Sequence, residues 1–114
     1  MNKASGYGEL TLNGKELSFK FGALAYRLLC EYRHIELSEL SALMKKDLYS
    51  VVELGYFAHV ADMRIKDKPP EVSLEWFIDA VGDSKEALPF IEETLSTAMV
   101  WGYNTDDIDV KKNP

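Results

Sequence analysis

The residues in this chain best suited to chemistry are His34, His59 and Cys30, its two histidines and its one cysteine. Glu31 and His34 stand in the Glu-x-x-His spacing that di-iron helix bundles use twice, together with two further glutamates. The second motif is absent, because Tyr56 stands three residues before His59. We therefore interpret Glu31 and His34 as the solvated end of a helix and expect no metal site.

Nucleophilic and phosphate-binding chemistry also lack their usual parts. Cys30 lies beside an apolar stripe with no base placed to activate its thiol, so we expect a buried and unreactive side chain. Gly6-Tyr7-Gly8 has too few glycines for a phosphate-binding loop and no helix is expected directly after it. A nucleophile elbow and paired Cys or His ligands are missing from the sequence. We expect a protein that is not an enzyme and that uses no cofactor.

Aromatic residues near the C-terminus are more informative. One face of the last expected helix is apolar throughout and suits a core, whereas a second face carries aromatic and hydroxyl side chains in equal number. Aromatic anchors beside small polar groups are typical of protein interfaces, and the edge of the core is the alternative position for them. The candidate partner-binding residues are Trp76, Phe90, Thr94, Thr97, Trp101 and Tyr103. On the interface interpretation, Phe90→Ala with Trp101→Ala weakens partner binding without unfolding the domain.

Length and composition fit one small domain. The chain has 114 residues, 46% of them apolar and 28% charged, which is enough to build a core and to keep it dissolved. A single cysteine allows no intramolecular disulfide, which suits a reducing compartment. The N-terminus lacks the apolar run of a signal peptide, and no apolar stretch is long enough to cross a bilayer. We expect a protein of the bacterial cytosol with no membrane contact.

The net charge of −6 argues against nucleic-acid binding. Such binding needs clustered Lys and Arg to displace counterions from phosphates, and here the adjacent basic pairs are Lys45-Lys46 and Lys111-Lys112. We expect partners that are proteins. Self-association is compatible with the sequence, which indicates no symmetry.

A β-hairpin is predicted over residues 9–21, ahead of the helices. Apolar and polar residues alternate on both sides of Asn13-Gly14, a dipeptide typical of type I′ turns because both residues tolerate positive φ. One face of this ribbon then carries five apolar side chains, which must pack on helices because two strands alone are marginal. These side chains are Leu10, Leu12, Leu17, Phe19 and Phe21.

Helical periodicity begins after Gly22 and predicts helices over about 23–33, 38–46 and 47–64, the third capped by Asp47. This third helix is apolar nearly all round, which is typical of a central helix, and Gly55 within it suggests that a neighbour approaches closely. Ser73 caps a fourth helix that Gly82 ends.

The last helix is expected to open at Asp83 with Glu86 as a capping box and to run to Trp101. Pro89 either kinks it or takes the first position of a helix that starts later. The prediction is a single domain spanning residues 1–114, with a core of about 8–102 and a loose tail of 103–114. Its fold class is α+β, mainly α, with an N-terminal β-hairpin packed on a compact bundle of four to five helices.

The order of elements and several local sequences resemble the tail assembly chaperones of long-tailed (siphovirus-type) bacteriophages and prophages. The resemblance starts with Gly-Glu-Leu-Thr-Leu-Asn-Gly-Lys-Glu-Leu-Ser-Phe-Lys-Phe-Gly at residues 8–22, which leads straight into a helix. It continues through Leu37-Ser-Glu-Leu, Val51-Val-Glu-Leu-Gly-Tyr-Phe-Ala-His-Val and Ser73-Leu-Glu-Trp-Phe-Ile-Asp-Ala-Val-Gly-Asp, and covers about residues 8–102. It is a resemblance of pattern, carried by no single diagnostic residue.

The resemblance implies a non-enzymatic chaperone that coats the helical tape-measure protein and recruits tail-tube subunits around it. In many such proteins a ribosomal frameshift makes a longer product, and the codons of Lys111-Lys112-Asn113 are compatible with an adenine-rich slippery run. Two alternatives remain open: a structural head–tail connector or tail-completion protein, and a helical regulatory or protein-interaction domain.

Overall fold

The chain opens with an antiparallel hairpin formed by β1 (Tyr7–Leu12) and β2 (Lys15–Lys20) in the computed structural model, which describes residues 6–104. Asn13 and Gly14 form its turn with φ of 48° and 79°, as the dipeptide predicts. Leu10 pairs with Leu17 across the ribbon, so the apolar side chains share one face. Four of the five are buried: Leu12, Leu17, Phe19 and Phe21.

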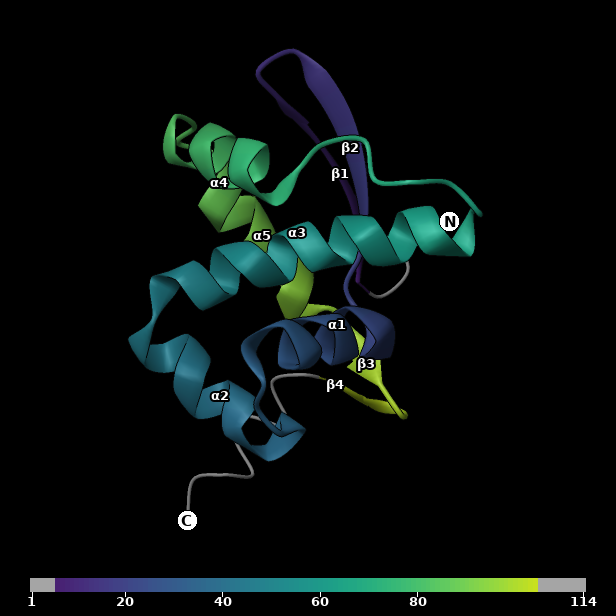
Figure 1. The fold of residues 1–114 in the computed structure, drawn as a ribbon, viewed down its shortest axis with the longest axis vertical. Helices are drawn as coiled ribbons and strands as arrows, with labels where there is room; N and C mark the ends of the chain where they lie inside the picture. Colours follow the sequence, from purple (N-terminus) through teal and green to yellow (C-terminus); the bar gives the residue numbers. More distant parts are fainter. Residues whose placement is uncertain (1–5, 105–114) are drawn as a thin grey trace.

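Five helices and a second, shorter hairpin follow in the described part of the chain (Figure 1). They are α1 (Ala23–Arg33), α2 (Leu37–Lys46), α3 (Leu48–Ile65), α4 (Leu74–Gly82), α5 (Ala87–Ser96), β3 (Met99–Val100) and β4 (Tyr103–Asn104). The α+β, mainly α fold class predicted from the sequence is confirmed. Most of the tail expected at 103–114, and the frameshift site proposed for Lys111–Asn113, lie outside the described residues.

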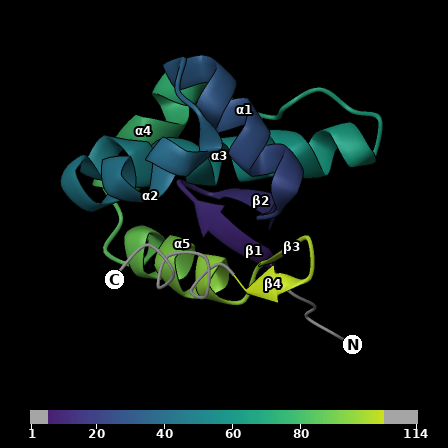
Figure 2. The same cartoon turned by 90° about the horizontal axis from the view of Figure 1, so that it is seen from below.

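The centre of the fold is α3, which contacts the first hairpin and the other four helices (Figure 1). Asp47 caps it by accepting a hydrogen bond from the Tyr49 N–H at 3.0 Å, as predicted. Gly55 lies where α5 crosses, and a Cβ built there would stand 2.9 Å from Cδ1 of Ile91. The close approach suggested by this glycine is confirmed. Figure 2 shows the first hairpin held between α3 and α5.

A fully buried histidine ties β2 and the loop before α4 to α3. His59 Nδ1 lies 2.9 Å from the Ser18 carbonyl oxygen, and Nε2 lies 3.0 Å from the Glu71 backbone nitrogen. A carbonyl oxygen only accepts and a backbone N–H only donates, so the ring is neutral, with its proton on Nδ1. One side chain thus fixes two segments distant in sequence.

Asp62, also fully buried, contacts β2 through the side chain of Ser18. Its Oδ2 accepts a hydrogen bond from the Ser18 hydroxyl and lies 2.9 Å from the Lys66 ammonium nitrogen. Burial by itself would raise the pKa of Asp62, but the hydrogen bond from Ser18 and the Lys66 ammonium outweigh it and hold the pKa below its ordinary value. The carboxylate is therefore charged at neutral pH.

The last helix differs from the prediction at its start. Asp83 and Glu86 form no capping box; instead, the Ser84 hydroxyl oxygen accepts hydrogen bonds from the N–H groups of Glu86 and Ala87, at 3.2 and 3.1 Å. Pro89 is the third residue of α5 and lies in its first turn. Backbone N–H groups in the first turn have no partner within the helix, so a proline there costs no helical hydrogen bond. The helix is neither kinked there nor started by the proline.

The predicted extension of this helix to Trp101 is wrong, because α5 ends at Ser96 and the chain forms the β3–β4 hairpin. Trp101 and Gly102 occupy the turn with φ of 52° and 84°, so Gly102 serves a hairpin and not a helix end. Thr97 favours the break: its Oγ1 donates to the Thr94 carbonyl at 2.8 Å and accepts from the Gly6 N–H at 3.0 Å.

Candidate protein-binding groove

A surface groove of about 980 Å³ runs along α1, the α1–α2 loop and the first turn of α2, and Trp101 from the β3–β4 turn stands on its other side. Figure 1 shows these elements at one end of the molecule, away from the first hairpin's turn. The groove takes its apolar lining from α1 and from the segment that leads into α2. These side chains are Ala23, Leu24, Tyr26, Cys30, Ile35 and Leu37.

The corner between α1 and α2 gives the groove its shape. His34 ends α1 in the left-handed region with φ of 58°, and the Ile35 N–H bonds back to the Cys30 carbonyl at 3.1 Å. Glu36 then opens α2, where the Glu39 carboxylate accepts a hydrogen bond from the Glu36 N–H at 2.8 Å. Two short-range devices therefore fix a sharp turn at the floor of the groove.

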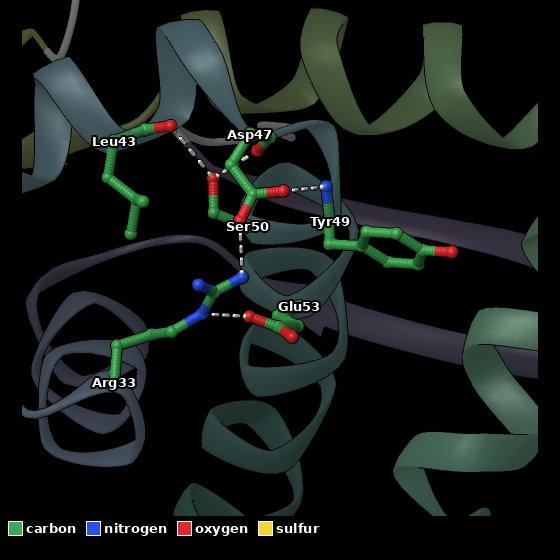
Figure 3. Close-up of polar contacts among 6 residues, drawn as sticks. All are labelled: Arg33, Leu43, Asp47, Tyr49, Ser50 and Glu53. Atoms are coloured by element: carbon green, nitrogen blue, oxygen red, sulfur yellow. Dashed lines mark hydrogen bonds and ion pairs between the residues drawn. The ribbon is translucent and has the colours of Figure 1, made fainter.

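An arginine clamps this corner onto the central helix (Figure 3). Arg33, the last residue of α1, donates from Nε to Glu53 at 2.7 Å and from a terminal nitrogen to Asp47 at 2.9 Å. Asp47 at the same time caps α3 through its other oxygen. The hydrogen bond to Glu53 is the main cause that raises the pKa of Arg33 above its ordinary value. The end of α1 is thus locked to the α2–α3 junction.

The rim of the groove is acidic. Its exposed polar side chains are three carboxylates, one guanidinium and one histidine: Glu31, Glu36, Glu39, Arg27 and His34. Arg27 is already paired with Glu31 at 2.9 Å, and within residues 6–104 no cation forms an ion pair with Glu36 or Glu39. Both of these carboxylates accept backbone N–H groups at the start of α2, and the rim carries more negative than positive side chains.

Cys30 is buried in the floor, as predicted. Burial is the main cause that raises the pKa of its thiol, and the carboxylates of Glu36, Glu31 and Glu39 raise it further. The thiol is therefore protonated at neutral pH and a poor nucleophile, which makes it an apolar part of the floor.

Large apolar side chains are exposed in the groove lining and on the β3–β4 hairpin. Trp101 is 69% exposed and Leu37 43% exposed, while Tyr103 and Met99 of the same hairpin are 55% and 43% exposed. Trp101 also adopts positive φ, which a bulky side chain rarely does. An exposed tryptophan held in an unfavourable backbone conformation beside an apolar groove is typical of a binding anchor.

The six residues predicted to bind a partner do not form one surface. Trp101 and Tyr103 are exposed on the second hairpin, whereas Trp76 is half-buried and packs against the core. Phe90 and Thr94 pack against β1 at Gly8, where a Cβ would stand 2.7 Å from the Phe90 ring. The absence of a side chain at Gly8 explains why this face of α5 covers the hairpin.

Thr97 is exposed, but its hydroxyl group is engaged with the N-terminal segment, as described above. Sequence reasoning missed the groove residues Leu24, Ile35 and Leu37. The signal that could have revealed part of the site was Gly102, because glycine suits a hairpin turn as well as a helix end.

Metal binding and membrane insertion find no support in the described part of the chain. Between residues 6 and 104, no group of three or more His, Cys, Asp or Glu side chains is arranged to hold a metal ion. No helix in the same stretch is both long and apolar enough to pass through a lipid bilayer.

Comparison with known proteins leaves the groove as the guide to function, since no protein-family model, curated protein or solved structure matches this chain.

Proposed function

We propose that this protein is a non-enzymatic tail assembly chaperone of a long-tailed phage or prophage, which binds the helical tape-measure protein and tail-tube subunits during assembly. The observation that carries the binding role is the apolar groove faced by Trp101, whose side chain is 69% exposed. The assignment to phage tails rests on the resemblance of the hairpin and following helices to such chaperones.

The charge of the chain supports this role. Copies of a protein with a net charge of −6 repel one another, so several of them spaced along one filamentous client would keep it dissolved. Each groove is small, and a weak contact at each site would add to a strong attachment along a long client. A coating function therefore needs no large interface on any one copy.

Co-expression tests the proposal. The chain is produced together with the tape-measure protein of the same phage or prophage, and the products are separated by size-exclusion chromatography. We expect a soluble complex that contains several copies of the chain. Trp101→Ala should weaken this complex by about 30-fold per site, the effect of losing a typical aromatic anchor. A client that stays insoluble, or that binds Trp101→Ala equally well, contradicts the proposal.

Tyr49→Ala is the matched control. Tyr49 is an exposed aromatic residue, at 62%, but lies outside the groove at the start of α3. Its removal deletes a similar apolar area while leaving the groove intact, so the complex should be unaffected. Equal losses from both substitutions would mean that general surface hydrophobicity, and not the groove, holds the client.

Mass spectrometry of purified phage particles separates this proposal from a structural connector or tail-completion protein. An assembly chaperone leaves when the tail is finished, so its peptides should be missing from particles that contain the tail-tube protein. Stoichiometric recovery of this chain from particles would favour the structural role.

A further inference from the structure

We propose that the groove binds a basic amphipathic α-helix of a partner protein, with apolar side chains on the floor and Lys or Arg side chains on the acidic rim. This inference rests on the proposed function in taking a protein as the occupant. It adds the chemistry of the bound segment, which is an amphipathic helix with a basic polar face.

The walls of the groove determine the secondary structure of the occupant. Two of them are helices α1 and α2, whose backbone groups bond within each helix. The third is the β3–β4 hairpin, whose strands are two residues each, so no wall offers a long row of free N–H and C=O groups to a strand. A segment bound there must satisfy its own backbone hydrogen bonds, and a helix does so. Its contact with the floor is then made by side chains at i, i+3 or i+4, and i+7.

The floor of the groove determines which side chains of the bound helix can contact it. Leu24, Ile35 and Leu37 contribute aliphatic surface, and Cys30 contributes a protonated thiol. Trp101 supplies an aromatic face from the opposite side, on a hairpin whose strands are two residues each. Aliphatic residues such as Leu or Met suit this lining, because burying them removes apolar surface from water on both partners.

The acidic rim determines the charge of the bound segment. Glu36 caps α2 and Glu39 lies in its first turn, where their carboxylates accept backbone N–H groups. Neither forms an ion pair with a cation among residues 6–104, and the ion pair of Glu31 is with Arg27. An acidic segment, or a second copy of this chain with its charge of −6, would be repelled. Lys or Arg at the edges of the bound helix would pair with these carboxylates and favour the correct orientation.

A pair of synthetic peptides tests the inference on the full chain. One is an amphipathic helix of about five turns with leucines on one face and lysines on the other, free of Trp and Tyr. Its twin has glutamate in place of every lysine. The protein carries Trp76→Phe, so that Trp101, the remaining one of two tryptophans, reports binding. We expect a shift of its emission to shorter wavelength, with the lysine peptide binding at least tenfold more tightly than its twin.

Two double variants locate the charge effect. Glu36→Gln with Glu39→Gln keeps side chains that can cap α2 but removes both charges, and should weaken the lysine peptide by about fivefold to tenfold. Glu92→Gln with Glu93→Gln removes the same charge from an exposed part of α5 outside the groove and should change the affinity by less than about twofold. Concentrated salt should abolish the difference between the two peptides.

Several results would overturn the inference. Equal affinity for both peptides contradicts the charge assignment, and no emission change with either contradicts the groove. If dimerisation shifts the Trp101 emission, the groove binds a second copy of the chain. If the emission of the free protein moves to longer wavelength in the double variant Ile108→Ser with Val110→Ser, the groove binds the chain's own C-terminal segment.

The two proposals fail separately. If neither peptide binds but the co-expressed client is still held in a Trp101-dependent way, the proposed function stands and the basic helix is wrong. If the lysine peptide binds in the groove but no tail protein does, the basic helix stands and the tail assembly role is wrong.

Discussion

The contact between Gly8 and Phe90 provides a quantitative test of how α5 covers the first hairpin. A Cβ at position 8 would lie 2.7 and 2.9 Å from two Phe90 ring carbons and 3.2 Å from Cγ2 of Thr94. Overpacking of this kind costs about 1–3 kcal/mol, and the lower chain entropy of alanine offsets about 0.5–1 kcal/mol. We therefore expect Gly8→Ala to lower the free energy of unfolding by about 1.5 kcal/mol.

Phe90→Ala should also destabilise the protein, as expected for a residue at the edge of the core and in contrast to the interface interpretation of the sequence. The ring is half-buried and lies 5.3 Å from the ring of Phe19, centroid to centroid. Full truncation of a buried phenylalanine costs about 3–5 kcal/mol, so partial burial reduces the expected loss to about 2 kcal/mol. The loss is large enough to measure by urea unfolding.

The double variant, Gly8→Ala with Phe90→Ala, is the decisive measurement. Removing the Phe90 ring removes the clash with the methyl group introduced at position 8, so the two losses should not add: we expect a total of about 2.5 kcal/mol, and an additive loss would be about 3.5 kcal/mol. Gly82→Ala is the control, because a Cβ there meets nothing within 4 Å, and it should leave stability unchanged or raise it by up to about 1 kcal/mol. Additivity within about 0.5 kcal/mol, or a negligible effect of Phe90→Ala, would refute this packing.

Three further substitutions test the polar contacts that hold the fold. Arg33→Met leaves the buried Glu53 carboxylate without its partner and should lower the free energy of unfolding by about 2 kcal/mol, since the site is partly solvated. A loss below about 0.5 kcal/mol, measured by chemical denaturation, would contradict the role of Arg33 in holding this corner. Thr97→Val removes the acceptor for the Gly6 N–H and should cost about 1 kcal/mol, seen as a lower melting temperature. The folded-state pKa of Asp62 is depressed, so its stabilising contribution is present above the ordinary value of 3.8 and is lost as the pH falls through the folded pKa. Unfolding midpoints measured from pH 6 to pH 2 should therefore fall less steeply for Asp62→Asn, and equal acid dependence would contradict the assignment.

Features encoded by neighbouring residues were predictable. The Asn13-Gly14 turn, the cap provided by Asp47 and the cap provided by Ser73 each depend on a few adjacent residues, and all three are observed. The start of α5 is the exception, because Ser84 competes with Asp83 for the same N–H groups and local sequence does not rank them. The close packing at Gly55 was predictable in kind, although its neighbour Ile91 was not.

The groove was not predictable, because its parts come from two segments distant in sequence, residues 23–39 and Trp101. Ala98 and Trp101 continue the helical spacing of α5, so periodicity alone extends the helix to residue 101. The chain departs from it because Thr97 makes a contact with Gly6, which is 91 residues away in sequence. Leu48 is a related case: it is apolar and follows the spacing of a core residue, yet it is 56% exposed at the α2–α3 corner.

The two hairpins differ in how much of their surface is available to a partner. The first hairpin is fixed on several sides: His59 and Asp62 bond to it from α3, and Phe90 covers it from α5. A partner that used the apolar face of this ribbon would have to displace core contacts. The second hairpin instead presents Trp101 to solvent, next to a corner that Arg33 holds rigid. A preformed floor facing an exposed aromatic residue loses little conformational entropy on binding, and this is why the groove, and not the face of α5, is the better place for a partner.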